Sequence, residues 1–354
     1  MKKNVYLLVL TIGFILFINP NLHAQKPYRI GTTSANFLEL GFGGAALSMG
    51  DSYVSMVNDV SAIYWNPAGL GYLKKNELMV MHQPWFADIN SSFVGLGYVD
   101  DYLGTFGLGL TFVSYGSEEV TSMLSQEGTG EKFDGLDLSL SISYGRKLAD
   151  WFSFGVSGKY ITSRIWHETA SAVAFDLGAI VNTSFLSWTG SKENGMKIGM
   201  SISNYGTRMQ YDGIDLKRPI DEAPDEGGNF AYVPARYETS GWELPLIFRI
   251  GISSYVIYSE NNKFLLSVDA LHPNNNSEHI NIGGEYLFTL PGVGTFALRS
   301  GYKGLMMVDS QYGWSFGAGF LVNYLGNNNI KIDYAYRDIG LLGNVHAYTF
   351  SITF

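Results

Sequence analysis

The chain has 354 residues, a formal net charge of −9, 42 glycines, no cysteine and 52 aromatic residues (7 Trp, 23 Tyr and 22 Phe). The acidic balance argues against nucleic-acid binding, which needs a basic surface. The absence of cysteine excludes disulfides, cysteine-ligated zinc, thiol catalysis and N-terminal lipoprotein modification. The aromatic content and the charged fraction of only 16% exclude intrinsic disorder.

The N-terminus has the pattern of a targeting segment. Lys2 and Lys3 precede an almost wholly apolar run over residues 5–18, and Ala24 ends a stretch typical of a signal-peptidase site. A membrane anchor helix is the alternative, but the run is shorter than the roughly 20 residues that such a helix needs, and Pro20 interrupts it. We therefore predict a signal peptide over residues 1–24, cleaved near Ala24, and an exported protein.

The next segment shows no strand pattern. Residues 41–71 read GFGGAALSMGDSYVSMVNDVSAIYWNPAGLG, and the glycines allow a close-packed backbone. Asp59 or Ser61 can cap a short helix over residues 62–65. Asn66-Pro67 ends that helix and can begin another turn, with the asparagine as cap and the proline at the first helical position. The sequence thus predicts a compact segment that precedes the strands.

From residue 76 onward the chain reads as many strands. Bulky apolar side chains alternate with small or polar ones over runs of about ten residues, separated by Gly, Asn and Asp turns. The last run is the clearest, with Tyr348 and Phe350 on one face and Ala347 and Thr349 on the other. Fourteen such runs are expected, approximately at residues 77–86, 91–99, 104–115, 135–147, 151–165, 172–184, 195–205, 243–257, 262–271, 278–289, 293–302, 312–324, 328–337 and 345–354.

The connections alternate between long and short. Long ones are expected at 116–134, 206–242 and 303–311, and the stretch 184–194 is an exception to the alternation. This asymmetry is typical of outer-membrane barrels. We predict a fourteen-stranded antiparallel up-and-down outer-membrane β-barrel over residues 76–354. Because so wide a barrel needs filling, we place residues 25–75 inside it as an N-terminal plug, or hatch.

A secreted sandwich or propeller would also alternate its strand faces. The bulky faces here are continuous on nearly every strand, however, and exceed what a sandwich could cover. Aromatic residues also gather near strand ends, where interfacial girdles lie. These are Trp85, Phe86, Trp151, Phe152, Trp166, Trp242, Trp314 and Tyr324. The terminal Phe354 resembles the signal read by the barrel assembly machinery, a predicted partner together with outer-membrane lipid.

Charged residues on the smaller strand faces would point into the lumen. We interpret them as structural ion pairs across strands and with the plug, since an isolated charge there is costly; the alternative is a role in selectivity. The predicted lumen charges are Asp137, Lys159, Asp176, Lys197, Arg249, Asp269, Glu285, Arg299, Lys331, Asp333 and Arg337.

The segment before the first strand resembles the N-terminal signature of the PorV/PorQ family, within the FadL-like group of outer-membrane barrels. The resemblance covers about thirty residues, and the fourteen predicted strands agree with it along the rest of the chain. The residues that carry it are Gly43, Gly44, Ala45, Met49, Gly50, Asn58, Asp59, Ser61, Ala62, Tyr64, Trp65, Asn66, Pro67, Ala68, Gly69 and Leu70.

The resemblance implies a non-enzymatic protein and two candidate functions. PorV-type members serve the type IX secretion system by carrying cargo with C-terminal signal domains to the translocon and attachment machinery. FadL-type members pass a hydrophobic small molecule through a hatch-gated barrel. We favour the first, although both branches share the motif.

No catalytic, cofactor-binding or metal-binding residue is predicted. His272 and His279 flank an asparagine-rich turn without Glu or Cys at metal spacing, and no HExxH, GxSxG or Walker pattern occurs. The 206–242 connection holds seven acidic and four basic residues with several tyrosines. We interpret it as a solvated loop, with a protein-contact surface or a calcium site as alternatives.

Overall fold

The computed structural model describes residues 29–227, 232–324 and 328–354. The predicted signal peptide, residues 1–24, lies outside the described residues. Among the described residues, no helix is both long and apolar enough to cross a membrane.

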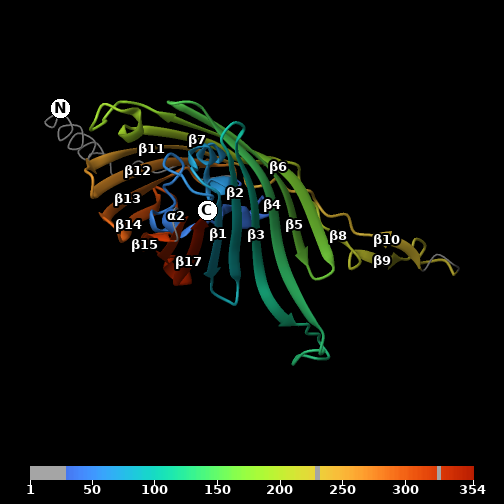
Figure 1. The fold of residues 1–354 in the computed structure, drawn as a ribbon. Coiled ribbons are helices and arrows are strands. Elements are labelled where there is room, and N and C mark those ends of the chain that lie inside the picture. Colours follow the sequence, from blue (N-terminus) through green and yellow to red (C-terminus); the bar gives the residue numbers. More distant parts are fainter. Residues whose placement is uncertain (1–28, 228–231, 325–327) are drawn as a thin grey trace.

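Fourteen antiparallel strands close into a barrel, which confirms the predicted fold class (Figure 1). Each strand pairs with its neighbour along the chain, β7 pairs with β11, and β1 pairs with β17 to complete the ring, from Glu77↔Thr353 to His82↔Tyr348. The barrel strands are β1(Glu77–Pro84), β2(Asn90–Asp100), β3(Gly104–Glu119), β4(Lys132–Ala149), β5(Phe152–Ile165), β6(Glu168–Asn182), β7(Lys197–Gly206), β11(Ile247–Tyr258), β12(Asn262–Pro273), β13(His279–Leu290), β14(Gly294–Leu305), β15(Trp314–Tyr324), β16(Asn328–Asp338) and β17(Asn344–Thr353).

The two faces of the wall differ as the alternation predicts. On β1, Met79 and Met81 are buried inside the barrel, whereas Leu78 and Val80 are exposed on its outer surface. The same pattern recurs around the ring, with exposed Phe106, Ile142 and other large apolar side chains on the outer face. A continuous apolar outer surface of this kind is suited to lipid.

Several predicted connections have more structure than expected. β3 extends to Glu119 and β4 begins already at Lys132, because the two strands stay paired beyond a register shift between Ser114 and Ser117. The predicted long loop at 116–134 is therefore shortened to residues 120–131. The connection after β7 contains β8(Asp212–Gly213) and a hairpin of β9(Lys217–Ile220) with β10(Val233–Arg236), which projects from the barrel (Figure 1).

In the described stretch before β1, residues 29–76, four short helices pack against the inner face of the barrel. They are η1(Asn36–Glu39), α2(Gly44–Ser48), α3(Ala62–Trp65) and η2(Pro67–Tyr72). α2 contacts β14 to β17, whereas η2 contacts β3 to β6, so this N-terminal segment (residues 36–73) touches different arcs of the wall. Two further short helices, η3(Lys192–Asn194) and η4(Gly340–Leu342), lie in connections.

Candidate functional site

The Asn66-Pro67 pair organises the middle of the N-terminal segment. Asn66 is extended, with φ −165° and ψ 105°, and its side chain accepts a hydrogen bond from the amide of Ala68 at the start of η2. Its Nδ2 also donates to the carbonyls of Val54 and of Ala179 on β6, at 2.9 and 3.2 Å. One buried asparagine thus caps a helix and joins two parts of the segment to the wall, in agreement with the predicted capping role.

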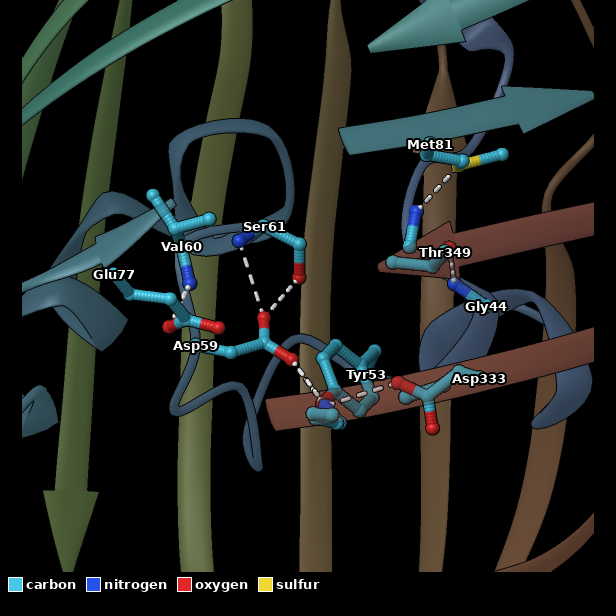
Figure 2. Close-up of polar contacts among 12 residues, drawn as sticks. Gly44, Tyr53, Asp59, Val60, Ser61, Glu77, Met81, Asp333 and Thr349 are labelled. Carbon is cyan, nitrogen blue, oxygen red and sulfur yellow. Dashed lines mark hydrogen bonds and ion pairs between the residues drawn. The ribbon is translucent and has the colours of Figure 1, made fainter. Parts of the chain in front are cut away.

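The predicted cap of the preceding helix is wrong. The helix does begin at Ala62, but neither Asp59 nor Ser61 caps it through its side chain. Asp59 instead accepts hydrogen bonds from the amide and hydroxyl of Ser61, and its second oxygen faces the barrel wall (Figure 2). The acidic side chain is therefore available for a long-range ion pair.

Glycines on the barrel wall make room for the N-terminal segment. A Cβ at Gly178 would overlap Oδ1 of Asn66, and a Cβ at Gly155 would overlap the backbone of Pro67. On the segment itself, Gly50 has φ +63° and lies against the backbone of Tyr302, a position that only glycine fits without strain. The other wall glycines whose Cβ would overlap the segment include Gly145, Gly199, Gly283, Gly301 and Gly317.

An aromatic cluster fills the centre of the segment. Trp65 is almost fully buried and donates from Nε1 to the carbonyl of Phe42 at 2.7 Å. Its ring meets the rings of Tyr53 and Tyr64 edge-on. The guanidinium of Arg249, from β11, lies over Tyr64 and Trp65 at 5.6 and 5.8 Å from the ring centroids. This wall residue therefore contacts the segment through its aromatic faces.

A network of ion pairs among five residues joins the segment to three wall strands. Lys331 Nζ lies 3.0 Å from Asp59 Oδ2 and 3.3 Å from Asp333 Oδ2. Arg299 continues the chain, at 2.7 Å from Asp333 and 2.6 Å from Glu285. The four wall charges were all predicted to point inward, and their side chains are buried or nearly so. Figure 2 shows the carboxylates of Asp59 and Asp333, each joined by a dashed line to the side chain between them.

A second network centres on Asp51, which sequence reasoning missed. Its Oδ2 lies 2.6 Å from Lys303 Nζ and 3.2 Å from Arg337 Nη2. Asp51 directly follows the Met49-Gly50 pair of the family motif, and this position was the available signal. Lys303 was also missed, because the eleventh strand was predicted to end at residue 302, whereas β14 continues to Leu305.

Two wall carboxylates bind backbone amides of the segment. Asp269 on β12 accepts from the amides of Tyr53 and Val54 at 2.7 and 2.9 Å. Glu77, at the start of β1, accepts from the amide of Val60 at 3.0 Å and was not predicted (Figure 2). Such bonds satisfy buried donors that have no partner within a helix.

Of the remaining predicted charges, Lys159, Asp176 and Asp137 contact other wall residues, whereas Lys197 contacts the segment. Lys159 lies 2.6 Å from Asp176, whose Oδ1 accepts from the amide of Asn204 at the register shift between β6 and β7. Asp137 accepts from the hydroxyl of Tyr115. Lys197 lies 5.3 Å from the ring centroid of Tyr72 at the end of the segment.

The other motif residues lie as follows. Gly43 and Gly44 donate from their amides to Met81 Sδ and Thr349 Oγ1, both at 2.9 Å (Figure 2). Asn58 is exposed and Gly69 is buried. The motif residues that are also buried are Met49, Ser61, Ala62, Trp65, Pro67 and Ala68.

The surroundings of the two segment carboxylates favour their charged forms. Burial alone would raise the pKa of Asp51, but Arg337 and Lys303 outweigh it and hold this pKa below its usual range. Burial likewise opposes ionisation of Asp59, and Lys331 with the Ser61 hydrogen bonds lowers the pKa. Both side chains are thus held as carboxylates at neutral pH.

Two of the cavities formed by the described residues lie between the segment and the wall. One of about 50 Å³ is lined by residues that include Glu39, Asp51, Arg249 and Lys303. The other, of about 10 Å³, lies near Phe42 and Lys159. Pockets for drug-sized ligands measure roughly 300 to 1,000 Å³, so neither cavity can hold such a ligand.

The most exposed large apolar side chains of the described residues lie on connections at one end of the barrel. Met123 and Leu124, between β3 and β4, are 94% and 98% exposed, and Leu341 between β16 and β17 is 91% exposed. Tyr232 and Tyr237 are exposed on the connection after β7. Antiparallel alternation places these three connections at the same end, which also carries the longest loop. We call this the long-loop end; among the described residues, its carboxylates form no group that could hold a metal ion.

Comparisons with solved structures show the same fold. The Pseudomonas putida toluene transporter TodX aligns with a TM-score of 0.54 and 12% identity over 88% of this chain and 97% of that chain. The Ralstonia pickettii toluene transporter TbuX aligns with a TM-score of 0.52 and 11% identity over 88% of this chain and 97% of that chain. For a Pseudomonas aeruginosa FadL homologue the TM-score is 0.50 and the identity 12%, over 88% of this chain and 98% of that chain. A search of curated proteins finds no match.

The family model for the type IX secretion system protein PorV matches residues 23–269, which is more than half of the chain. The match includes the N-terminal motif and the strands through most of β12. Together with the closed barrel and its apolar outer face, it confirms the family resemblance and the outer-membrane location. The chain belongs to the PorV family of outer-membrane β-barrels.

Proposed function

We propose that this barrel is a non-enzymatic component of a type IX secretion system that binds secreted cargo at the outer membrane. The cargo would be held through its C-terminal signal domain at the long-loop end and passed to the translocon and attachment machinery. The observation that carries the proposal is the set of exposed apolar side chains at that end, represented by Met123, Leu124 and Leu341. Apolar side chains collected on exposed loops favour a protein partner.

We further propose that residues 25–75 act as a plug that stays in place while cargo binds, after removal of residues 1–24 as a signal peptide. The ion pairs of Asp51 and Asp59 with the wall support this role. The glycines that receive the segment, such as Gly155 and Gly178, also suit a permanently seated element. The predicted lumen charges other than Arg249 then act structurally, with Phe354 as the signal for barrel assembly.

Transport of a hydrophobic small molecule through a hatch-gated barrel is the alternative. It requires the segment to move or a route beside it to open. The two cavities of about 50 and 10 Å³ are too small for this purpose as they stand. Charged side chains also border both cavities, with Asp51 and Lys303 at one and Lys159 at the other.

A paired loop substitution tests cargo binding. Met123→Ser with Leu124→Ser should weaken binding of a purified cargo signal domain about tenfold, because burial of such side chains is worth about 1.5–3 kcal/mol each when complete. Tyr102→Ser with Leu103→Ser is the control, since these large side chains are also exposed, at 86% and 58%, but lie at the opposite end. Equal loss in both variants, or no loss in the first, would contradict the proposed contact surface.

A further inference from the structure

We propose that a small carboxylate binds in the cavity of about 50 Å³, with Arg249 as the group that holds it. The site is separate from the apolar loops, and the inference does not depend on cargo binding. It rests on the pairing of the buried charges around this cavity.

The cavity lies between the N-terminal segment and the long-loop end of the wall. Glu39, Asp51, Tyr64 and Trp65 of the segment form one side. The opposite side comes from β11 to β14 and from the connections that follow β12 and β14, including Asn276, Met307 and Tyr312. A solute can therefore reach the site from the end that carries the long loops.

Of Arg249 and Lys303, the two basic side chains with a permanent charge in this lining, only Lys303 forms an ion pair among the described residues. Arg249 is buried, yet no carboxylate lies within 4 Å of its guanidinium among the described residues. One Nη donates to the hydroxyl of Ser203 at 2.8 Å, and Nε has no hydrogen-bond partner. The rings of Tyr64 and Trp65 below it stabilise a cation but accept no hydrogen bond in the plane of the guanidinium. A buried guanidinium left in this condition is costly unless a ligand completes it.

None of the nearby carboxylates among the described residues pairs directly with Arg249. Asp51 is engaged by two cations, Lys303 and Arg337, so its single charge is already matched. Asp269 accepts from two backbone amides of the segment through Oδ2, and its Oδ1 has no hydrogen-bond partner. Glu39 accepts from Asn275, and burial raises its pKa, which makes the neutral form more accessible. Arg249 Nε is thus a buried donor beside the cavity from which no carboxylate of the described residues accepts a hydrogen bond.

The dimensions select the class of anion. A cavity of about 50 Å³ corresponds to roughly four waters at 10–15 Å³ each. A carboxylate with a short stem is of this size, and an extended alkyl chain is not. Arginine is the side chain whose planar fork matches a carboxylate with two parallel hydrogen bonds. The unpartnered Nε2 of His279 marks a further polar position in the same cavity.

Acetate is the probe for the test, with the full-length barrel in detergent micelles. Saturation-transfer NMR should show saturable acetate binding to the wild type. Arg249→Gln should weaken it about tenfold or more, because charge-assisted hydrogen bonds are lost. Arg164→Gln is the control, since Arg164 is exposed and pairs with Asp134 on β4. This variant should bind acetate as the wild type does.

Filling the cavity gives an independent variant. Met307→Trp adds bulk from a partly exposed loop position and alters no charged group. It should abolish acetate binding while the barrel remains folded, so it decides the question even if Arg249→Gln does not fold. Absence of acetate binding to the wild type, or undiminished binding to Met307→Trp, would overturn the proposal. Much tighter binding of hexanoate than of acetate would also overturn it, because it would mean an apolar tunnel rather than a carboxylate-sized site.

Discussion

Lys331 Nζ on β16 lies 3.0 Å from Asp59 Oδ2 in the N-terminal segment, so one ion pair joins residues 272 positions apart in the chain. The Lys331 side chain is only 19% exposed and that of Asp59 only 8%. Replacing both members of such a buried pair by apolar residues changes the stability little. Removing only one member is destabilising, because it leaves an unpaired buried charge. The segment and the barrel are therefore energetically coupled through this ion pair.

Lys331→Met should destabilise the folded barrel by about 3 kcal/mol or more, because Asp59 and Asp333 both lose a buried cation. Urea unfolding in lipid vesicles, followed by tryptophan fluorescence, measures the change. Lys147→Met is the matched control, since the exposed Lys147–Asp150 pair contributes little. The double variant Lys331→Met with Asp59→Asn should be less destabilised than the two single effects added, and strict additivity would argue against the pair.

Acid should weaken the contact of Asp59 only at low pH. Because its folded-state pKa lies below the ordinary 3.8, the stabilisation is complete above that value and is lost as the pH falls through the lower folded-state pKa. The difference in melting temperature between the wild type and Asp59→Asn should stay constant from about pH 8 to 5 and shrink below about pH 4. A difference that disappears near pH 6 would show that the carboxylate is not held as the ion pair requires.

Two glycines on β5 should differ sharply in their tolerance of alanine. A Cβ at Gly155 meets the backbone of Pro67, which has no flexible end to move, so Gly155→Ala should cost about 1–3 kcal/mol. At Gly158, on the same strand, the nearest atom is Phe175 Cε1 at 3.9 Å, so Gly158→Ala should be neutral. Equal effects of the two substitutions on unfolding would contradict the close seating of the segment.

A disulfide can test whether the segment must move. The hydroxyls of Ser52 and of Ser267 on β12 lie 2.9 Å apart, and the chain has no other cysteine to compete. Ser52→Cys with Ser267→Cys should cross-link in the oxidising periplasm, with cargo display unchanged. Loss of function that a reductant restores would instead favour hatch-gated transport. Each single-cysteine variant serves as the control.

The barrel could be predicted from the sequence because apolar and polar side chains alternate with a period of two along outer-membrane strands. All fourteen strands occur, and the largest boundary errors lie at the end of β3 and at the starts of β6 and β11. β3 is longer than predicted because its pairing with β4 continues past an irregularity between Ser114 and Ser117. The hairpin of β9 and β10 was missed because Pro219 and Pro234, which lie opposite each other, argue against strands.

The contacts inside the barrel were harder to predict. Alternation showed which charges face inward, but their partners depend on the register between segment and wall, which no local pattern encodes. Asp51 was overlooked because an acidic residue after glycine looks like an ordinary turn. Asp59 was assigned a capping role that the local sequence allowed, whereas the distant Lys331 is its principal partner. Long-range pairing overrode local preference at both positions.

Deletion of the gene, followed by proteomics of the cell surface, tests the central claim most directly. If the barrel carries type IX cargo, proteins with C-terminal signal domains should disappear from the surface and return when the wild-type chain is restored. Met123→Ser with Leu124→Ser should restore them poorly, whereas Tyr102→Ser with Leu103→Ser should restore them fully. Unchanged display of all such cargo in the deletion strain, with no second family member present, would contradict the account.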